Sequence, residues 1–118
     1  MSQDKEKVAD ETMKIVEERL NENKDVAAGW GQMVQQIFSD IGIGYRFKFA
    51  MDGTVTIEKA KASEIKPEDA VATVTITDVE TFKDMVDGTL PPMEAQGTGK
   101  VKVDGDINAL LKLLPAFG

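Results

Sequence analysis

The sequence contains neither histidine nor cysteine among its 118 residues. Without histidine, a Ser-His-Asp or Cys-His arrangement, a histidine general base and a histidine-bearing zinc site are impossible. Without cysteine, disulfide frameworks, thiolate metal sites and cysteine nucleophiles are excluded too. Most common hydrolytic mechanisms are excluded with them. We expect no catalytic residues, no metal site, no cofactor and no enzymatic activity.

Long apolar runs are also missing, since no stretch approaches the roughly 20 residues of a membrane-spanning helix. Residues 1–11 are charged throughout, so we expect neither a secretory signal nor a membrane anchor, and a cytoplasmic protein with no stable membrane insertion. The net charge of -7 should repel nucleic-acid phosphate, which excludes nucleic acid as a partner. Composition shows no break that would mark a linker, so residues 1–118 are expected to form a single domain.

Helical spacing is clearest over residues 5–20. One face of this predicted helix carries apolar side chains, namely Val8, Ile15, Val16 and Leu20. Asn23 is placed to cap a short second helix that ends between Gly29 and Gly31, with Trp30 as a core anchor.

Strand alternation is clearest over residues 45–51, where Tyr45, Phe47, Phe49 and Met51 share one face. Asp52-Gly53 predicts a two-residue hairpin turn into a second strand over residues 54–61. Residues 35–41 are a weaker strand candidate, because the same stretch could extend a helix.

The second half predicts a strand over residues 71–77 and then a helix opened by a capping box from Thr77 to Glu80. Gly88 suits the residue just past the end of this helix. Pro91-Pro92 can open a further helical turn, and residues 100–103 alternate as a last strand. Asp104 or Asp106 could cap a terminal helix that is apolar over most of its circumference, and should therefore be covered on more than one side.

Two stretches look like ligand motifs but lack required residues. Residues 97–100 resemble the end of a phosphate-binding loop, yet Glu94 and Val101 stand where a glycine and a Ser or Thr are needed. Residues 104–115 begin like a calcium loop, yet Ala109 and Pro115 replace the required glycine and glutamate. We expect neither a phosphate site nor a calcium site here.

From residue 70 to 117 the sequence resembles the sterol-carrier-protein-2 domain family. The strand Val-Thr-Ile-Thr, the stretch Asp-Gly-Thr-Leu-Pro-Pro-Met-Glu-Ala and the run Gly-Lys-Val-Lys-Val-Asp-Gly-Asp before a leucine-rich end carry the resemblance. The matching residues are Thr75, Ile76, Phe82, Gly88, Leu90, Pro92, Met93, Ala95, Gly99, Lys100, Val103, Gly105, Leu110, Leu111 and Leu114.

The resemblance implies an α+β fold, in which helices cover a five-stranded, largely antiparallel sheet and leave an apolar tunnel between the two layers. It implies a non-catalytic carrier of a fatty acid, fatty acyl-CoA, sterol or similar lipid. Gln96-Gly97 departs from the bulky apolar pair common in the family, which could widen or polarise one end of the tunnel. The resemblance and the apolar faces together predict these ligand-binding residues: Phe47, Phe49, Met51, Phe82, Met85, Val86, Leu90, Met93, Leu110, Leu111, Leu114 and Phe117.

Three readings of the apolar residues remain open at this point. The residues alone describe an ordinary packed core as well as a cavity. An apolar groove could instead serve a structural or regulatory module that binds a partner protein or forms a homodimer. An enzyme such as a thioester hydrolase would need a pair of carboxylates in the tunnel, and no Asp or Glu interrupts the predicted apolar faces.

Overall fold

The fold combines one sheet with helices and short 3₁₀ turns. The computed structural model describes residues 2–117. Its helices are α1 (Ser2–Glu22), α2 (Val79–Asp87) and α3 (Pro92–Gly97). Its 3₁₀ turns are η1 (Lys24–Val26), η2 (Ala62–Glu64), η3 (Pro67–Asp69), η4 (Ile107–Lys112) and η5 (Leu114–Ala116). Its strands are β1 (Met33–Phe38), β2 (Ile43–Phe49), β3 (Val55–Lys61), β4 (Ala72–Ile76) and β5 (Val101–Gly105).

The five strands form one sheet in the order β3-β2-β1-β4-β5. Every neighbouring pair is antiparallel except β1 and β4, which run parallel. The predicted α+β fold with a largely antiparallel five-stranded sheet is therefore confirmed. Residues 35–38 of the weaker strand candidate lie in β1, the central strand, and residues 39–41 form the turn after it, so the helical alternative for that stretch is wrong.

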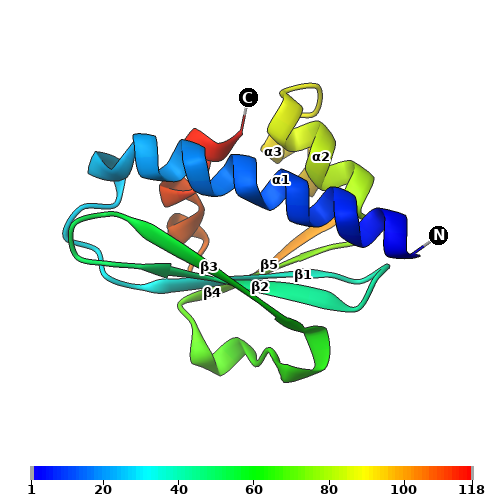
Figure 1. The fold of residues 1–118 in the computed structure, drawn as a ribbon, viewed down its shortest axis with the longest axis horizontal. Helices are drawn as coiled ribbons and strands as arrows, with labels where there is room; N and C mark the ends of the chain where they lie inside the picture. Colours follow the sequence, from blue (N-terminus) through cyan, green and yellow to red (C-terminus); the bar gives the residue numbers. More distant parts are fainter. Residues whose placement is uncertain (1, 118) are drawn as a thin grey trace.

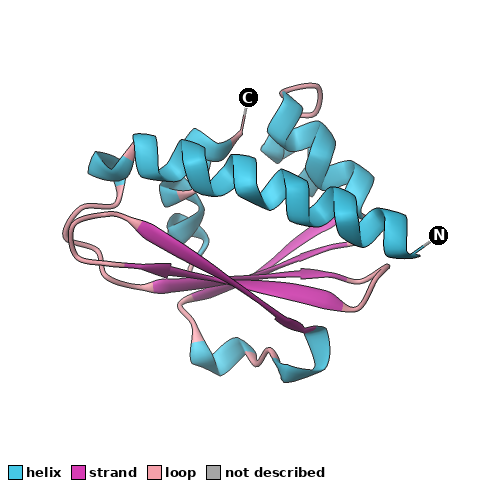
Figure 2. Ribbon diagram, viewed as in Figure 1, coloured by secondary structure: helices cyan, strands magenta, loops and turns pink. Residues whose placement is uncertain are grey.

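The helices lie on one face of the sheet (Figures 1 and 2). Helix α1 crosses above the hairpin of β2 and β3, while α2, α3 and the C-terminal turns share the same side. The segment that contains η2 and η3 covers part of the opposite face. Among the described residues, no helix combines the length and the apolar character needed to cross a bilayer.

Four aromatic rings link the sheet to the helices and the C-terminal end. Phe38 on β1 makes edge-to-face contacts with Tyr45 at 5.9 Å and with Phe82 of α2 at 5.3 Å between ring centroids. Phe82 in turn meets Phe117 at 6.4 Å. Phe38 and Phe82 are almost completely buried, so this row of rings forms the centre of the core.

Helix α1 is longer than predicted and buries a slightly different face. Its buried positions include Ala9, Met13, Val16 and Leu20, whose spacing of four, three and four residues follows one side of a helix. Ile15 is exposed, so the predicted stripe is wrong at that position.

The predicted second helix after α1 is reduced to the single 3₁₀ turn η1. Asn23 does not cap this turn with its side chain. Instead its Nδ2 donates a hydrogen bond to the Arg19 carbonyl at 2.8 Å, which satisfies the end of α1. Trp30 is only partly buried, against Phe49.

The hairpin between β2 and β3 contains one more residue than the Asp52-Gly53 turn predicts. Ala50 and Thr54 still pair, and Gly53 donates to the Ala50 carbonyl at 3.0 Å with a φ of 93°. This is the geometry of a three-residue turn that ends in a left-handed glycine. Met51 consequently lies in the turn, 67% exposed, rather than on the buried face of the strand.

Asp78, not Thr77, caps α2. The Asp78 carboxylate accepts a hydrogen bond from the Thr81 amide at 2.7 Å, while the Thr77 amide still donates to the Lys100 carbonyl at 2.9 Å. Thr77 therefore extends the pairing of β4 with the β5 side of the sheet, and the helix begins one residue later than the capping-box spacing indicates. Gly88 ends the helix in the left-handed conformation, as predicted.

The C-terminal segment forms the 3₁₀ turns η4 and η5 where a continuous helix is predicted. Asp106 caps the first turn by accepting from the Asn108 amide at 2.9 Å. Pro115 has no amide hydrogen and cannot extend a helical ladder. Two hydrogen bonds hold the segment to the rest of the fold: Arg19 of α1 donates to the Ala116 carbonyl at 2.9 Å, and Lys112 of η4 donates to the Val26 carbonyl at 3.1 Å.

A polar network fastens α1 to the hairpin beside the core. The Tyr45 hydroxyl donates to Asp10 at 2.7 Å, and the Lys59 ammonium reaches both Glu6 at 2.8 Å and Asp10 at 3.0 Å. Burial, the hydrogen bond to Asp10 and the negative charges of Asp10 and Glu6 raise the pKa of Tyr45 well above its ordinary value of 10.0.

We expect the pKa of Tyr45 to make the fold sensitive to alkali. The unfolded chain releases the tyrosine proton near pH 10 whereas the folded chain retains it, so the free energy of unfolding should fall as pH rises above about 10. The protein has one tyrosine, which makes its phenolate absorbance specific. That absorbance should appear only as the protein unfolds, and Tyr45→Phe should reduce the alkaline loss of stability. Phenolate formation near pH 10 in protein with a native circular dichroism spectrum would contradict this expectation.

Candidate functional site

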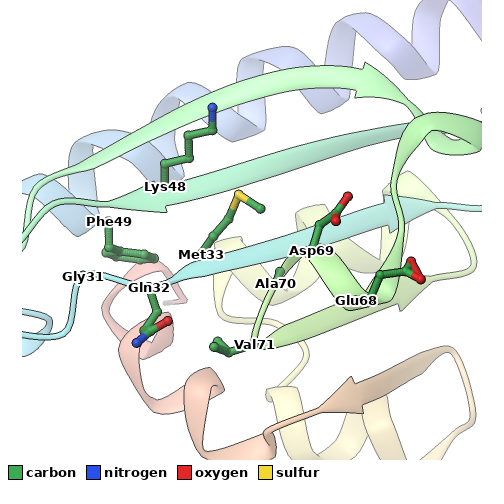
Figure 3. Close-up of a pocket in the computed structure, with 9 residues that line it drawn as sticks. All are labelled: Gly31, Gln32, Met33, Lys48, Phe49, Glu68, Asp69, Ala70 and Val71. Carbon is green, nitrogen blue, oxygen red and sulfur yellow. The ribbon is translucent and has the colours of Figure 1, made fainter.

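Two of the hollows in the surface differ in chemistry and lie on opposite faces of the sheet. The first, of about 470 Å³, lies between the β1 and β2 ends and the residues before β4 (Figure 3). Its wall includes the charged residues Lys48, Glu68 and Asp69, and the Lys48 ammonium is already bonded to Glu58 at 2.7 Å. This mixed, charged surface does not fit the apolar ligand that the sequence predicts.

The second hollow is a cavity of about 370 Å³ on the helical face, and we take it as the candidate site. Strands β1, β4 and β5 supply its floor, and α2, α3 and the C-terminal turns supply its walls. The lining residues are Gln36, Val74, Ile76, Phe82, Met85, Pro92, Met93, Gln96, Val101, Ile107, Asn108, Leu110, Leu111, Leu113, Leu114 and Phe117.

The wall of this cavity is apolar apart from three amide side chains. Those three are Gln36, Gln96 and Asn108, and none of the sixteen described lining residues is ionisable. Such a wall offers no acid, no base and no nucleophile to a bound molecule. A volume at the lower end of the ordinary range for ligand pockets, with few polar groups, suits a slender apolar molecule.

Gln36 differs from the other two amides because it is buried. Its side chain is 4% exposed, and its Nε2 has no hydrogen-bond partner. An unpaired buried polar group of this kind costs about 1–3 kcal/mol. The neighbouring Gln35, on the opposite face of β1, donates its Nε2 to the Lys66 carbonyl at 2.8 Å and to Thr73 at 3.2 Å, while its Oε1 is buried without a partner.

The rim of the cavity exposes apolar side chains. Met93 is 85% exposed, and Ile107, Leu111 and Leu114 also lie largely in solvent. The predicted cover over more than one side of the terminal segment is therefore absent from the described part of the chain. The wall instead reaches the surface, so a bound molecule longer than the cavity would extend past these residues.

Seven of the twelve predicted ligand-binding residues meet in this cavity. They are Phe82, Met85, Met93, Leu110, Leu111, Leu114 and Phe117. Phe47, Phe49, Val86 and Leu90 pack into or against the core away from the cavity, and Met51 lies in the hairpin turn. The separation follows from α1, which occupies the space above β2 and β3, so the rings of β2 cannot face the cavity. As ligand contacts, all twelve stay predictions.

Sequence reasoning missed most of the floor. Val74, Ile76 and Val101 reach the cavity because β4 pairs with β5 in a register that sets Ile76 beside Val101. Their alternation was visible in the sequence, but the strand pairing that gathers them was not. Gln36 carried a usable signal, since it is a polar residue at the middle of the alternating positions Val34, Gln36 and Phe38.

Solved structures with the same fold share little sequence with this chain. A stereoselective inverting sec-alkylsulfatase from Pseudomonas sp. matches with a TM-score of 0.64 and 23% identity, over 80% of this chain but only 14% of the enzyme. Sterol carrier protein 2 of Aedes aegypti, solved in complex with the C16 fatty acid palmitate, matches with a TM-score of 0.62 and 17% identity over 94% of this chain and 97% of its own. The sterol carrier protein domain 2 of Helicoverpa armigera matches with a TM-score of 0.60 and 22% identity, over 86% and 78% respectively.

At these identities the structural matches establish a common fold alone. No curated protein matches the sequence significantly. A model of the SCP-2 sterol transfer family, however, matches residues 11–118, which is nearly the whole chain. The chain therefore belongs to the SCP-2 sterol transfer family.

Proposed function

We propose that residues 1–118 act as one non-catalytic lipid-binding domain, which holds a fatty acid, fatty acyl, sterol or similar molecule in the cavity between sheet and C-terminal turns. The observation that carries the proposal is the cavity of about 370 Å³ with thirteen apolar residues among its sixteen. Membership of the SCP-2 sterol transfer family and the palmitate complex of the Aedes aegypti protein support it.

Burial of an apolar chain alone can supply the affinity. Each buried methylene contributes about 0.8 kcal/mol, so ten of them contribute roughly 8 kcal/mol before the loss of rigid-body and chain freedom is subtracted. A charged head group, such as a carboxylate or a coenzyme A moiety, would remain in water past the exposed rim at Met93 and Leu111. No side chain of the described wall could act as an acid or base, which favours binding over hydrolysis.

We expect long-chain lipids to bind the ligand-stripped protein with micromolar affinity and to raise its melting temperature by several degrees at saturation. The measurement combines native mass spectrometry of freshly purified protein with displacement of a fluorescent fatty acid and a thermal melt. An unchanged melting temperature together with no displacement would contradict the proposal.

The exposed rim favours a second candidate, an interaction module. Met93, Ile107, Leu111 and Leu114 form an apolar surface that a second copy of the chain could cover. The same native mass spectra separate the two functions, because a lipid-loaded monomer supports the carrier and a ligand-free dimer supports the module.

A further inference from the structure

The deepest polar group of the cavity has no partner within the protein. Gln36 lies on β1, the central strand, so its backbone is occupied by pairing with both β2 and β4. The side chain points to the helical face beside Val34 and Phe38, and its register partners are Tyr45 and Val74. The Tyr45 hydroxyl donates its proton to Asp10 and makes no hydrogen bond with Gln36, whose Nε2 is unpaired.

A buried polar atom without a partner is uncommon in a native fold and requires an explanation. Such a group loses its hydration when the protein folds, and a native fold keeps it only where something else compensates. A water molecule is held firmly in a cavity when it finds two to four polar partners. Around Gln36 the wall is apolar, and the other two amides, Gln96 and Asn108, are exposed.

We infer that Gln36 is a specificity-determining residue, which hydrogen-bonds a neutral oxygen function of the ligand, a hydroxyl or a carbonyl, at the floor of the cavity. This inference rests on the proposed lipid-binding function. A terminal amide can donate through Nε2 or accept through Oε1 after a half-turn, so both kinds of oxygen fit.

Because the described wall carries no charged side chain, an ionised group of the ligand is excluded at that depth. A carboxylate that enters an apolar cavity needs a cation or several donors to offset its lost hydration. The described lining residues supply no cation, and the Arg19 guanidinium of α1 is bonded to the carbonyls of Val86 and Ala116. An ionised lipid must therefore bind with its charge at the rim and its methyl end toward Gln36.

The inference predicts that replacing Gln36 changes the affinities of three probes of equal chain length in different ways. The probes are 1-decanol, decane and ionised decanoate. In Gln36→Leu the affinity for decanol should fall about tenfold relative to the affinity for decane, as the loss of one hydrogen bond implies. Decanoate, which would meet residue 36 with its tail, should bind equally well or better. The melting temperature of the ligand-free variant should equal or exceed that of the parent, since an unpaired amide has been removed.

Gln35→Leu is the matched control, because it makes the same change in the neighbouring buried amide of β1, which lies on the face of the sheet away from the cavity. It should alter the ratio of decanol to decane affinity less than twofold. In the unmutated protein, nitrogen-15 spectra should show the Gln36 side-chain amide shifting with decanol but not with decane, a reading that needs no variant.

The outcomes separate the inference from the proposed function. If all three probes bind the parent but Gln36→Leu leaves their relative affinities unchanged, the role of Gln36 is wrong and the lipid-binding proposal stands. Equal losses for decanol and decanoate would overturn the restriction to neutral oxygen. If no probe binds the parent, the inference fails, and the displacement assay with long-chain lipids decides the proposed function separately.

Discussion

Val74→Phe should weaken lipid binding at least thirtyfold, about 2 kcal/mol, while the ligand-free protein remains nearly as stable as the parent. Val74 lies on β4 at the floor of the cavity and is almost completely buried. In a close-packed core the larger side chain would cost about 1–3 kcal/mol, because neighbours would have to move. Beside a cavity of about 370 Å³ the ring can instead occupy the space that the ligand needs.

Thr75→Phe is the control for this experiment. It places the same ring one residue along β4, on the opposite face of the sheet, where Thr75 pairs with Lys102. Affinities come from displacement of a fluorescent fatty acid, and stabilities from urea unfolding of stripped protein. Marked destabilisation by Val74→Phe with unchanged affinity would mean that the lipid binds elsewhere.

Phe38→Ala should be the most destabilising single change in the sheet, with a loss of about 3–5 kcal/mol and a melting temperature about 10–20 °C lower. The Phe38 ring is fully buried and touches both Tyr45 and Phe82 edge to face, so its removal leaves a void between the sheet and α2. A domain with ordinary stability of 5–15 kcal/mol would lose a large share of it.

Phe117→Ala provides the comparison, since Phe117 ends the same row of rings but is only partly buried at the cavity wall. It should cost much less stability and should change lipid affinity instead. Urea unfolding measures the first effect and fluorescent displacement the second. Equal stability losses in the two variants would show that the row of rings is not centred on Phe38.

Sequence patterns predicted the elements well where one residue type dominates one face. The alternation of Tyr45, Phe47 and Phe49 predicted β2. With aromatic side chains on one face of the strand and charged ones on the other, only the aromatic face can be directed toward the core. The alternation across β1 was harder to interpret, because Gln36 interrupts its apolar face. Gln36, which made β1 difficult to recognise in the sequence, is also the one buried amide among the described residues of the cavity wall.

Errors arose where a local signal competed with a long-range contact. Thr77 satisfies the capping-box spacing, but its amide already donates to the carbonyl of Lys100, the residue before β5, so Asp78 caps the helix instead. The leucines near the C-terminus fit a helix, yet Pro115 and the side chain of Arg19 hold the segment in shorter turns. Neither the pairing of β4 with β5 nor the reach of Arg19 can be derived from spacing along the chain.

The floor of the cavity is stiffer than the C-terminal part of its wall. The floor consists of three strands joined by continuous rows of backbone hydrogen bonds. The C-terminal wall consists of η4 and η5, whose 3₁₀ hydrogen bonds have poorer geometry than those of an α-helix. Hydrogen bonds from two long cationic side chains, Arg19 and Lys112, connect this wall to the rest of the fold. In the proposed carrier, Gln36 on the stiff floor would recognise an oxygen atom of the ligand. The more deformable wall of η4 and η5 would allow ligands of different chain length to bind.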